Sequence, residues 1–418
     1  MTALLPALAL LLSVRVSAGP VPPRPARVLT GIDVLEADGF RELQGKRIGL
    51  VTNQAGVDRG GRWTGDVLAH APGVRLEALF GPEHGLIEGA VVSSGAYRFP
   101  DGRTIPVYPS FHGELQPPAA ALKNLDALVF DLQDVGARFY TYATTIALAL
   151  PLAKARGLTV YVLDRPNPIN GKTVEGPVLQ PDVRSFVSYL PVPTRHGLTM
   201  GELARLADEK VGADLRVIRM RGWRRAMWFD QTGLPWIAPS PNMPDLDSAV
   251  LYPGISSLEA ANVAVGRGTP TPLRWIGAPW LDAGRLVAYL RRHPLPGIAY
   301  EERTYVPTRD RWAYKGEKCP GVLVRVTDRD EARPLEVFAV LACALRDTQG
   351  GRFDLRWRRK GEDAPKNGFF LPTTRRLVGS DEFYRLYEAG APPSRIIAFF
   401  RRDAARFRAA RRRLLLYR

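Results

Sequence analysis

Short apolar runs alternate with segments of helical periodicity along the first half of the chain, and this alternation constrains the fold more than any other feature. Helical periods are clearest at Thr141–Arg156 and Thr199–Val211. Strands that alternate with helices form a mostly parallel sheet covered on both faces, so we predict an α/β fold with a Rossmann-like sheet. The five predicted strands lie at residues 47–52, 74–80, 127–131, 159–163 and 215–220.

Polar side chains follow four of these strands directly. Asn53 and Gln54 follow the first strand, and the segment GPEHG at 81–85 follows the second. Gln133 and Asp134 follow the third strand, and the segment DRPN at 164–167 follows the fourth. Ligand crevices of open α/β sheets form at the carboxyl ends of the strands. The convergence of four polar segments therefore predicts a site at this edge.

The chain has 418 residues, more than one ordinary core holds, so we predict more than one domain. A stretch rich in Pro and Gly at 238–279 is expected to form loops near the site. Beyond it we predict a strand at 322–326 and helices at 335–345 and 394–416. The predicted parts are a signal peptide at 1–18, a Pro-rich linker at 19–27, a Rossmann-like catalytic domain at 28–294 and a smaller auxiliary α/β domain at 295–418.

The first residues predict export. An apolar run from Leu4 to Val16 ends in Ser17-Ala18-Gly19, as in a secretory signal peptide. It is too short to span a bilayer comfortably, so we expect no stable membrane anchor and a location in the periplasm or outside the cell. An exported protein could pair Cys319 with Cys343, which the sequence alone leaves open.

The net charge of +16 favours an anionic partner such as nucleic acid, acidic lipid or acidic carbohydrate. Nucleic acid is disfavoured because aromatic residues are not interleaved with the arginine runs as a stacking platform requires. The glycine patterns of dinucleotide-binding, P-loop and α/β-hydrolase enzymes are absent, and so are the common metal-ligand spacings.

Six motifs occur in order along the chain: FGPEHG (80–85), FDLQDVGARFYTY (130–142), LDRPNPING (163–171), RHGLTMGELA (195–204), PSPNMP (239–244) and YPGISSLEAANVAVGRGT (252–269). Together they are similar to the exo-β-N-acetylmuramidase (NamZ-like) family, once known only as a domain of unknown function. The resemblance runs from about Val28 to the C-terminus.

The resemblance implies a Rossmann-like domain and a smaller auxiliary domain with the site between them. It implies release of N-acetylmuramic acid from the non-reducing end of peptidoglycan-derived fragments, with no metal or organic cofactor. The glutamate of the family's E-H-G motif, its proposed acid catalyst, falls on Glu83.

Glycoside hydrolysis needs a proton donor and a group that stabilises the oxocarbenium-like centre. Glu83 is the predicted donor. For the second role the residues leave two alternatives, either a carboxylate that acts itself or one that orients the substrate's acetamido group as nucleophile. Asp134 is the first candidate, with Asp131 and Asp164 as others.

The lactyl carboxylate of N-acetylmuramic acid favours recognition by arginine. Arg138 and Arg165 are the preferred candidates because they follow strand ends, and Arg195 and Arg267 also lie in the motifs. Each residue also has a structural interpretation as an ion pair, a turn, a helix cap or packing, and for Glu202 capping is preferred. The other predicted substrate-binding residues are His84, Gln133, Tyr140, Asp164, Asn167, His196, Asn242, Glu259 and Asn262.

A non-catalytic periplasmic binder of cell-wall sugar fragments is the alternative function. Such a binder would use the same cleft without hydrolysis. The residue that separates the two hypotheses is Glu83, because a binder needs no proton donor there and would keep its affinity after the substitution Glu83→Gln.

Overall fold

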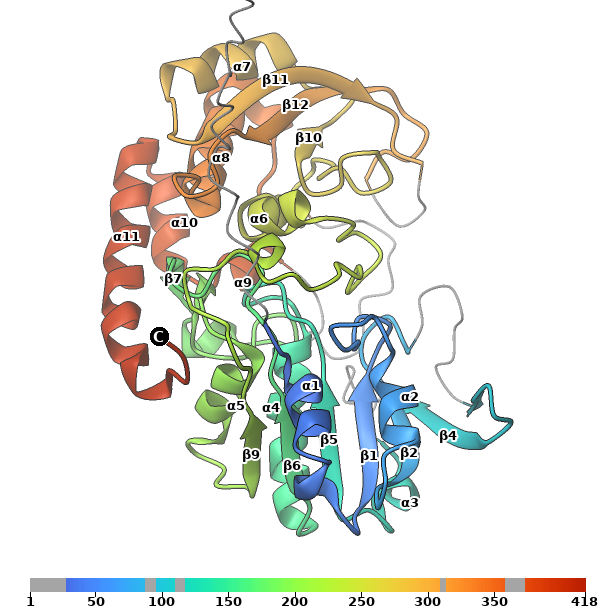
Figure 1. Ribbon diagram of the computed structural model, residues 1–418. Coiled ribbons are helices and arrows are strands. Elements are labelled where there is room, and N and C mark those ends of the chain that lie inside the picture. The colour runs from blue at the N-terminus through green and yellow to red at the C-terminus, as the bar shows by residue number, and fades with distance from the viewer. Residues whose placement is uncertain (1–27, 87–94, 110–116, 309–312, 358–372) are drawn as a thin grey trace, which may run out of the picture.

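The computed structural model describes residues 28–86, 95–109, 117–308, 313–357 and 373–418 (Figure 1). The predicted signal peptide and linker lie outside these residues. A seven-stranded sheet forms the lower half of Figure 1, in the order β3-β4-β2-β1-β5-β6-β9. Its strands are β1 (Arg47–Thr52), β2 (Arg75–Gly81), β3 (Gly95–Arg98), β4 (Thr104–Pro109), β5 (Ala127–Asp131), β6 (Thr159–Leu163) and β9 (Leu215–Ile218).

The sheet is parallel except for β3, which pairs antiparallel with β4. This confirms the predicted α/β class and all five predicted strands, although the last one ends at Ile218. From β1 the chain builds outward to β2 on one side and to β5 on the other, so the strand order reverses between β1 and β5. Their register places Thr52 beside Asp131 at the carboxyl edge. Crevices for ligands form at such a reversal point.

The central strands β1, β5 and β6 are buried along almost their whole length because both faces of the sheet are covered there. Leu128 and Phe130 of β5 pack in one core with α3 (Ala119–Leu122), α4 (Tyr142–Ala155) and α5 (Met200–Asp208). Ala127 and Val129 point to the opposite face, where α1 (Gly31–Ala37) and α2 (Thr64–Ala69) complete a second core. Successive side chains of one strand thus contribute to different cores.

A smaller antiparallel sheet, in the order β10-β12-β11, forms the upper half of Figure 1. Its strands are β10 (Trp275–Gly277), β11 (Ile298–Tyr305) and β12 (Cys319–Val326). The accompanying helices are α6 (Leu246–Ile255), α7 (Ala283–Arg292), α8 (Pro334–Gln349), α9 (Thr374–Val378), α10 (Asp381–Glu388) and α11 (Pro393–Ala410). The predicted strand and helices in this part are confirmed, although the long helix stops at Ala410. Because β10 precedes residue 295, this sheet draws on residues from both sides of the predicted domain boundary.

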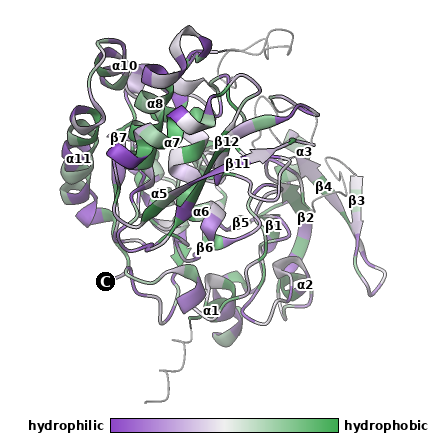
Figure 2. Cartoon of the chain, turned by 90° about the horizontal axis from the view of Figure 1, so that it is seen from above, coloured by the Kyte–Doolittle hydropathy of each residue, from purple (hydrophilic) through white to green (hydrophobic). Residues whose placement is uncertain are grey.

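Short elements connect these parts. The two-stranded ribbon of β7 (Glu175–Val178) and β8 (Pro193–Arg195) packs against α11. Seen from above in Figure 2, α11 lies at one flank of the molecule and β3 with β4 at the opposite flank. The 3-10 helices are η1 (Arg41–Leu43), η2 (Pro181–Val183), η3 (Phe229–Gln231), η4 (Ser256–Leu258), η5 (Gly350–Arg352) and η7 (Arg411–Leu414).

The segment expected to form loops contains helix α6, which was not predicted. Asp245 caps this helix by accepting the backbone N–H of Ser248 at 2.8 Å. Its residues from Ser248 to Ile255 are buried, Pro253 included. Burial of an apolar segment outweighs the helix-breaking tendency of Pro and Gly here, which sequence pattern alone does not show.

The two cysteines do not form a disulfide. Cys319 in β12 and Cys343 in α8 are both free and buried. Within the described residues no helix is long and apolar enough to cross a membrane.

Candidate active site

Glu83 lies in a tight turn directly after β2. His84 and Gly85 both adopt left-handed backbone conformations, with φ angles of 73° and 82°. The Glu83 side chain is half-buried, whereas His84 is exposed. The hydroxyl of Thr141, the N-cap residue of α4, donates a 2.5 Å hydrogen bond to Glu83 Oε2. The turn thus presents the predicted acid at the carboxyl edge of the sheet, beside the first turn of a helix.

Tyr252 of α6 is buried, and several charged side chains of the site lie near enough to affect it. Its pKa is raised above the ordinary value, first by burial and then by the charges of Glu259, Glu83 and Asp134, while Arg267 acts to lower it. Its ring packs edge-to-face against those of Phe139 and Tyr140. Carboxylates from both halves of the molecule are therefore close enough to influence one phenol.

Glu259 and Arg267 form an ion pair next to Tyr252. Arg267 Nε lies 2.7 Å from one carboxylate oxygen of Glu259, and Nη2 donates to the other at 2.9 Å. Burial acts to lower the pKa of Arg267, but Glu259, Tyr252 and Glu83 outweigh it and raise that pKa. The residues Ser256 to Glu259 have the sequence of a helix-capping box, but Glu259 does not cap a helix here, because Ser256 ends α6 and Glu259 follows a 3-10 turn.

Asp134 lies just beyond β5 and is 3% exposed. Its Oδ2 accepts the backbone N–H of Gly136 at 2.6 Å and lies 3.4 Å from Nε2 of the buried His196. Among the described residues, Asp134 Oδ1 and His196 Nε2 have no hydrogen-bond partner although both atoms are buried. A buried polar atom without a partner is costly, so such atoms are expected where a ligand supplies the missing bond.

Arg138, predicted to bind the substrate's carboxylate, has a structural position instead. Its four terminal N–H groups donate to backbone carbonyls, each at 2.8 Å. The side chain is 3% exposed, and burial lowers its pKa to about 9. Four of the five donors of this guanidinium join segments of the fold and, among the described residues, Nε alone has no partner, so no pair of donors is left for the predicted bidentate contact. The four acceptors are Pro177, Val192, Leu377 and Val378.

Arg165, the second preferred candidate, is also committed internally. It forms a bidentate ion pair with Asp131, at 2.5 Å from Oδ1 and 2.7 Å from Oδ2, and donates to the Val57 carbonyl. Thr64 completes the coordination of Asp131. The neighbouring residues Asp164 and Arg165, which the sequence would allow to form an ion pair, do not pair, because the guanidinium binds Asp131. Asp131 therefore has a structural position, whereas Arg165 also lines the pocket described below.

Asp164 is fully buried and accepts hydrogen bonds from donors in four residues. Burial nevertheless raises its pKa to about 6. Its hydrogen bonds tie the end of β6 to helix α5 and to the last residues of the chain, so its position is structural. The donors are the backbone N–H groups of Arg165 and Gly201 and the hydroxyls of Thr199 and Tyr417.

Most of the remaining predicted residues are buried or stabilise loops through hydrogen bonds to the backbone. Asn167 bonds to the Leu198 carbonyl, and Asn262 to the backbone of Arg352 and Asp354, so both stabilise loops. Asn242 is buried within the motif at 239–244. Tyr140 is buried with its ring against Tyr142. The predicted capping role of Glu202 is confirmed, because it closes the box with Thr199.

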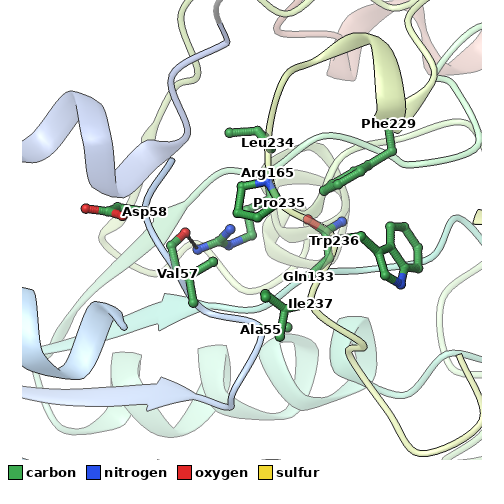
Figure 3. A pocket seen from close by; sticks show the side chains of 10 residues that line it. All are labelled: Ala55, Val57, Asp58, Gln133, Arg165, Phe229, Leu234, Pro235, Trp236 and Ile237. Atoms are coloured by element: carbon green, nitrogen blue, oxygen red, sulfur yellow. Dashed lines mark hydrogen bonds between the residues drawn. The ribbon is translucent and has the colours of Figure 1, made fainter. Parts of the chain in front are cut away.

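A small pocket opens at the carboxyl ends of β1 and β5. Figure 3 shows Gln133 and Arg165 among the side chains that line it, and the dashed line marks the bond from Arg165 to Val57. Gln133 donates to the carbonyls of Asp134 and Pro166, which keeps the predicted residue at this edge. The other lining residues are Ala55, Asp58, Phe229, Leu234, Pro235, Trp236 and Ile237.

Sequence reasoning missed Thr141 and Tyr252 and undervalued Arg267. All three lie inside the quoted motifs, which was the available signal. Assigning them required the contacts between β2, α4 and α6, which lie far apart in sequence. No cluster of His, Cys, Asp and Glu side chains in the described parts of the chain is arranged to hold a metal ion.

Comparison with known proteins agrees with the fold. The family model for the N-terminal part of the exo-β-N-acetylmuramidase NamZ matches residues 48–247, and the C-terminal model matches residues 250–417. The peptidoglycan β-N-acetylmuramidase NamZ of Bacillus subtilis is 38% identical over 94% of this chain and 92% of its own length.

Two crystal structures of DUF1343 family proteins from Bacteroides fragilis are similar over nearly the whole chain. The first has a TM-score of 0.81 and 33% identity, covering 95% of this chain and 100% of its own. The second has a TM-score of 0.71 and 27% identity, covering 94% and 99%. With both family models matched across most of its length, the chain belongs to the exo-β-N-acetylmuramidase NamZ family.

Proposed function

We propose that the protein hydrolyses β-glycosidic bonds of N-acetylmuramic acid at the non-reducing end of peptidoglycan-derived fragments. The observation that carries the proposal is the position of Glu83, half-buried at the carboxyl edge and hydrogen-bonded to Thr141. The similarity to a peptidoglycan β-N-acetylmuramidase supports the substrate class. Export, which such a substrate requires, rests on the sequence of residues 4–18.

Glu83 serves as the general acid. The Thr141 hydroxyl donates to Oε2, which leaves Oε1 to carry the proton that passes to the leaving oxygen. General acid catalysis by one positioned side chain contributes about 10²–10⁴-fold to a rate. The geometry at Glu83 suits this role because the carboxyl group is oriented by a fixed hydroxyl and keeps one side open.

Asp134 serves as the second group by orienting the substrate's acetamido substituent. Its Oδ2 is bound by the Gly136 N–H, so the buried Oδ1 is the oxygen that lacks a partner among the described residues. An acetamido N–H would supply that bond, and the acetamido oxygen would attack the anomeric carbon as Glu83 protonates the leaving oxygen. Water would then open the cyclic intermediate, with the Glu83 carboxylate accepting its proton, and the configuration would be retained.

Arg267 is the guanidinium best placed for the lactyl carboxylate. Arg138 and Arg165 are committed as described above, and Arg195 is 1% exposed and bound to Glu175 and the Ile169 carbonyl. Arg267 lies close enough to Glu83 for their charges to interact, and its side chain is 13% exposed. Its partner Glu259 holds the guanidinium in place.

The test is release of free sugar from a chromogenic β-N-acetylmuramide, with the corresponding N-acetylglucosaminide as the substrate control. We expect the purified chain to turn over the muramide alone, and Glu83→Gln to lower kcat by about 10²–10⁴-fold. The matched control is Glu77→Gln, an exposed position on β2 that should keep full activity. No turnover by the folded wild type, with sugar binding unchanged in Glu83→Gln, would favour the non-catalytic binder.

A further inference from the structure

His196 is held in one tautomer by its own loop. The ring is 1% exposed, and its Nδ1 accepts the backbone N–H of Leu198 at 3.1 Å. A nitrogen that accepts a hydrogen bond carries no proton, so the neutral ring has its N–H at Nε2. The donor of this imidazole is therefore the nitrogen that faces Asp134.

The distance between His196 and Asp134 is slightly too long for a hydrogen bond. His196 Nε2 lies 3.4 Å from Asp134 Oδ2, which is longer than a normal N–H···O bond of 2.7–3.2 Å. Both side chains are nine-tenths buried or more. Hydrogen bonds of catalytic groups are often long without substrate and tighten when it binds.

The loop that carries His196 is fixed by two buried arginines. Arg411, from the segment after α11, donates to the carbonyls of His196 at 3.0 Å and Gly197 at 2.6 Å. Arg225 donates to the same Gly197 carbonyl at 2.9 Å. Gly197 has a φ of 60°, and a side chain there would collide with the Arg411 guanidinium. The clamped backbone keeps the imidazole beside Asp134.

We propose that His196 is a positioning residue that acts through Asp134, not a substrate contact as the sequence suggested. It donates Nε2–H to Asp134 Oδ2 when substrate binds and so fixes the orientation of Oδ1 toward the acetamido N–H. This inference rests on the proposed function, because it assigns the geometry of the second group in that reaction.

Two substitutions of His196 test the roles of its two ring nitrogens separately. His196→Asn places an oxygen near the Nδ1 position and retains the bond from Leu198, but it removes the donor that faces Asp134. His196→Gln places an amide donor near the Nε2 position and loses the loop bond. We expect His196→Asn to lower kcat by about 10- to 100-fold with KM little changed, as removal of an outer partner does. His196→Gln should keep kcat within a few fold of wild type while lowering the melting temperature.

A double-mutant cycle with Asp134→Asn tests whether His196 acts through Asp134. We expect His196→Asn to add less than about threefold to the loss already caused by Asp134→Asn, because coupled residues are not additive. Full additivity, or an equal loss of kcat in the Gln and Asn variants, would overturn the positioning role. A wild type without muramidase turnover would instead refute the proposed function, so the two failures are distinguishable.

Discussion

Two buried aspartates three residues apart, Asp131 and Asp134, show how differently the end of one strand can be used. Asp131 at the end of β5 accepts hydrogen bonds on both oxygens, from Arg165 and Thr64. Asp134 has one oxygen bound and the other without a partner among the described residues, next to an equally open His196. A carboxylate whose bonds are complete stabilises the fold, whereas one with an open bond is available to a ligand.

The largest expected effect tests the structural side of this comparison. Asp131→Asn leaves the buried Arg165 guanidinium without its counter-charge, so we expect a loss of about 3–5 kcal/mol in the free energy of unfolding. Chemical denaturation measures this loss. The activity of the molecules that remain folded should be close to wild type, and a specific loss of kcat at full stability would contradict the assignment.

A comparable effect is expected from pH at Asp164, whose bonds are also complete. Its pKa near 6 in the folded state exceeds the ordinary value of 3.8, so the folded protein binds the proton more tightly than the unfolded chain. The contribution of Asp164 to stability is therefore fully present below about pH 4 and is lost as pH rises through 6, a change of about 3 kcal/mol. The difference in unfolding free energy between wild type and Asp164→Asn, measured from pH 4 to 7, should fall with rising pH. A flat difference would show that the bonds of Asp164 offset its burial.

Asp134→Asn tests the functional side. We expect kcat to fall by about 10²-fold, close to 2.7 kcal/mol in transition-state stabilisation, while the melting temperature stays within a few degrees of wild type. Steady-state kinetics and thermal unfolding on one preparation give both quantities. The comparison between the two aspartates fails if Asp134→Asn destabilises the protein as much as Asp131→Asn does.

The smallest expected effect is at Thr141. The substitution Thr141→Val keeps the shape of the side chain and removes the hydroxyl that holds Glu83 Oε2. Because Glu83 acts in its protonated form, loss of this neutral hydrogen bond costs about 0.5–1.5 kcal/mol, so we expect kcat/KM to fall by up to about tenfold. Thr144→Val, one turn further along α4 and bonded to the Phe186 carbonyl, is the matched control that should leave kcat/KM unchanged.

The sheet could be predicted from the sequence because its strands are continuous apolar runs, as at Ala127–Asp131 and Thr159–Leu163. Helix α6 could not, because the burial that stabilises Tyr252 and Pro253 comes from tertiary packing. The motifs also placed Glu83 and Asp134 at one edge of the sheet.

Which arginine faces the site could not be predicted. Arg138 and Arg267 both lie in motifs, and only the structure shows that four carbonyls use the donors of Arg138. The same applies to Asp131 and Asp134, since completeness of hydrogen bonding depends on residues far apart in sequence. Motif membership therefore identifies candidates, and the contacts made by each polar atom separate structural residues from functional ones.

The four carbonyls around Arg138 have a consequence for how such proteins can be recombined. Pro177 and Val192 belong to the segment matched by the N-terminal family model, and Leu377 and Val378 to the segment matched by the C-terminal one. A chimera that joins the two halves of different relatives must recreate this carbonyl arrangement around one buried guanidinium. We therefore expect the two halves to be inherited and exchanged together. In a chimera, α9 and the loop before α4 should come from the same relative.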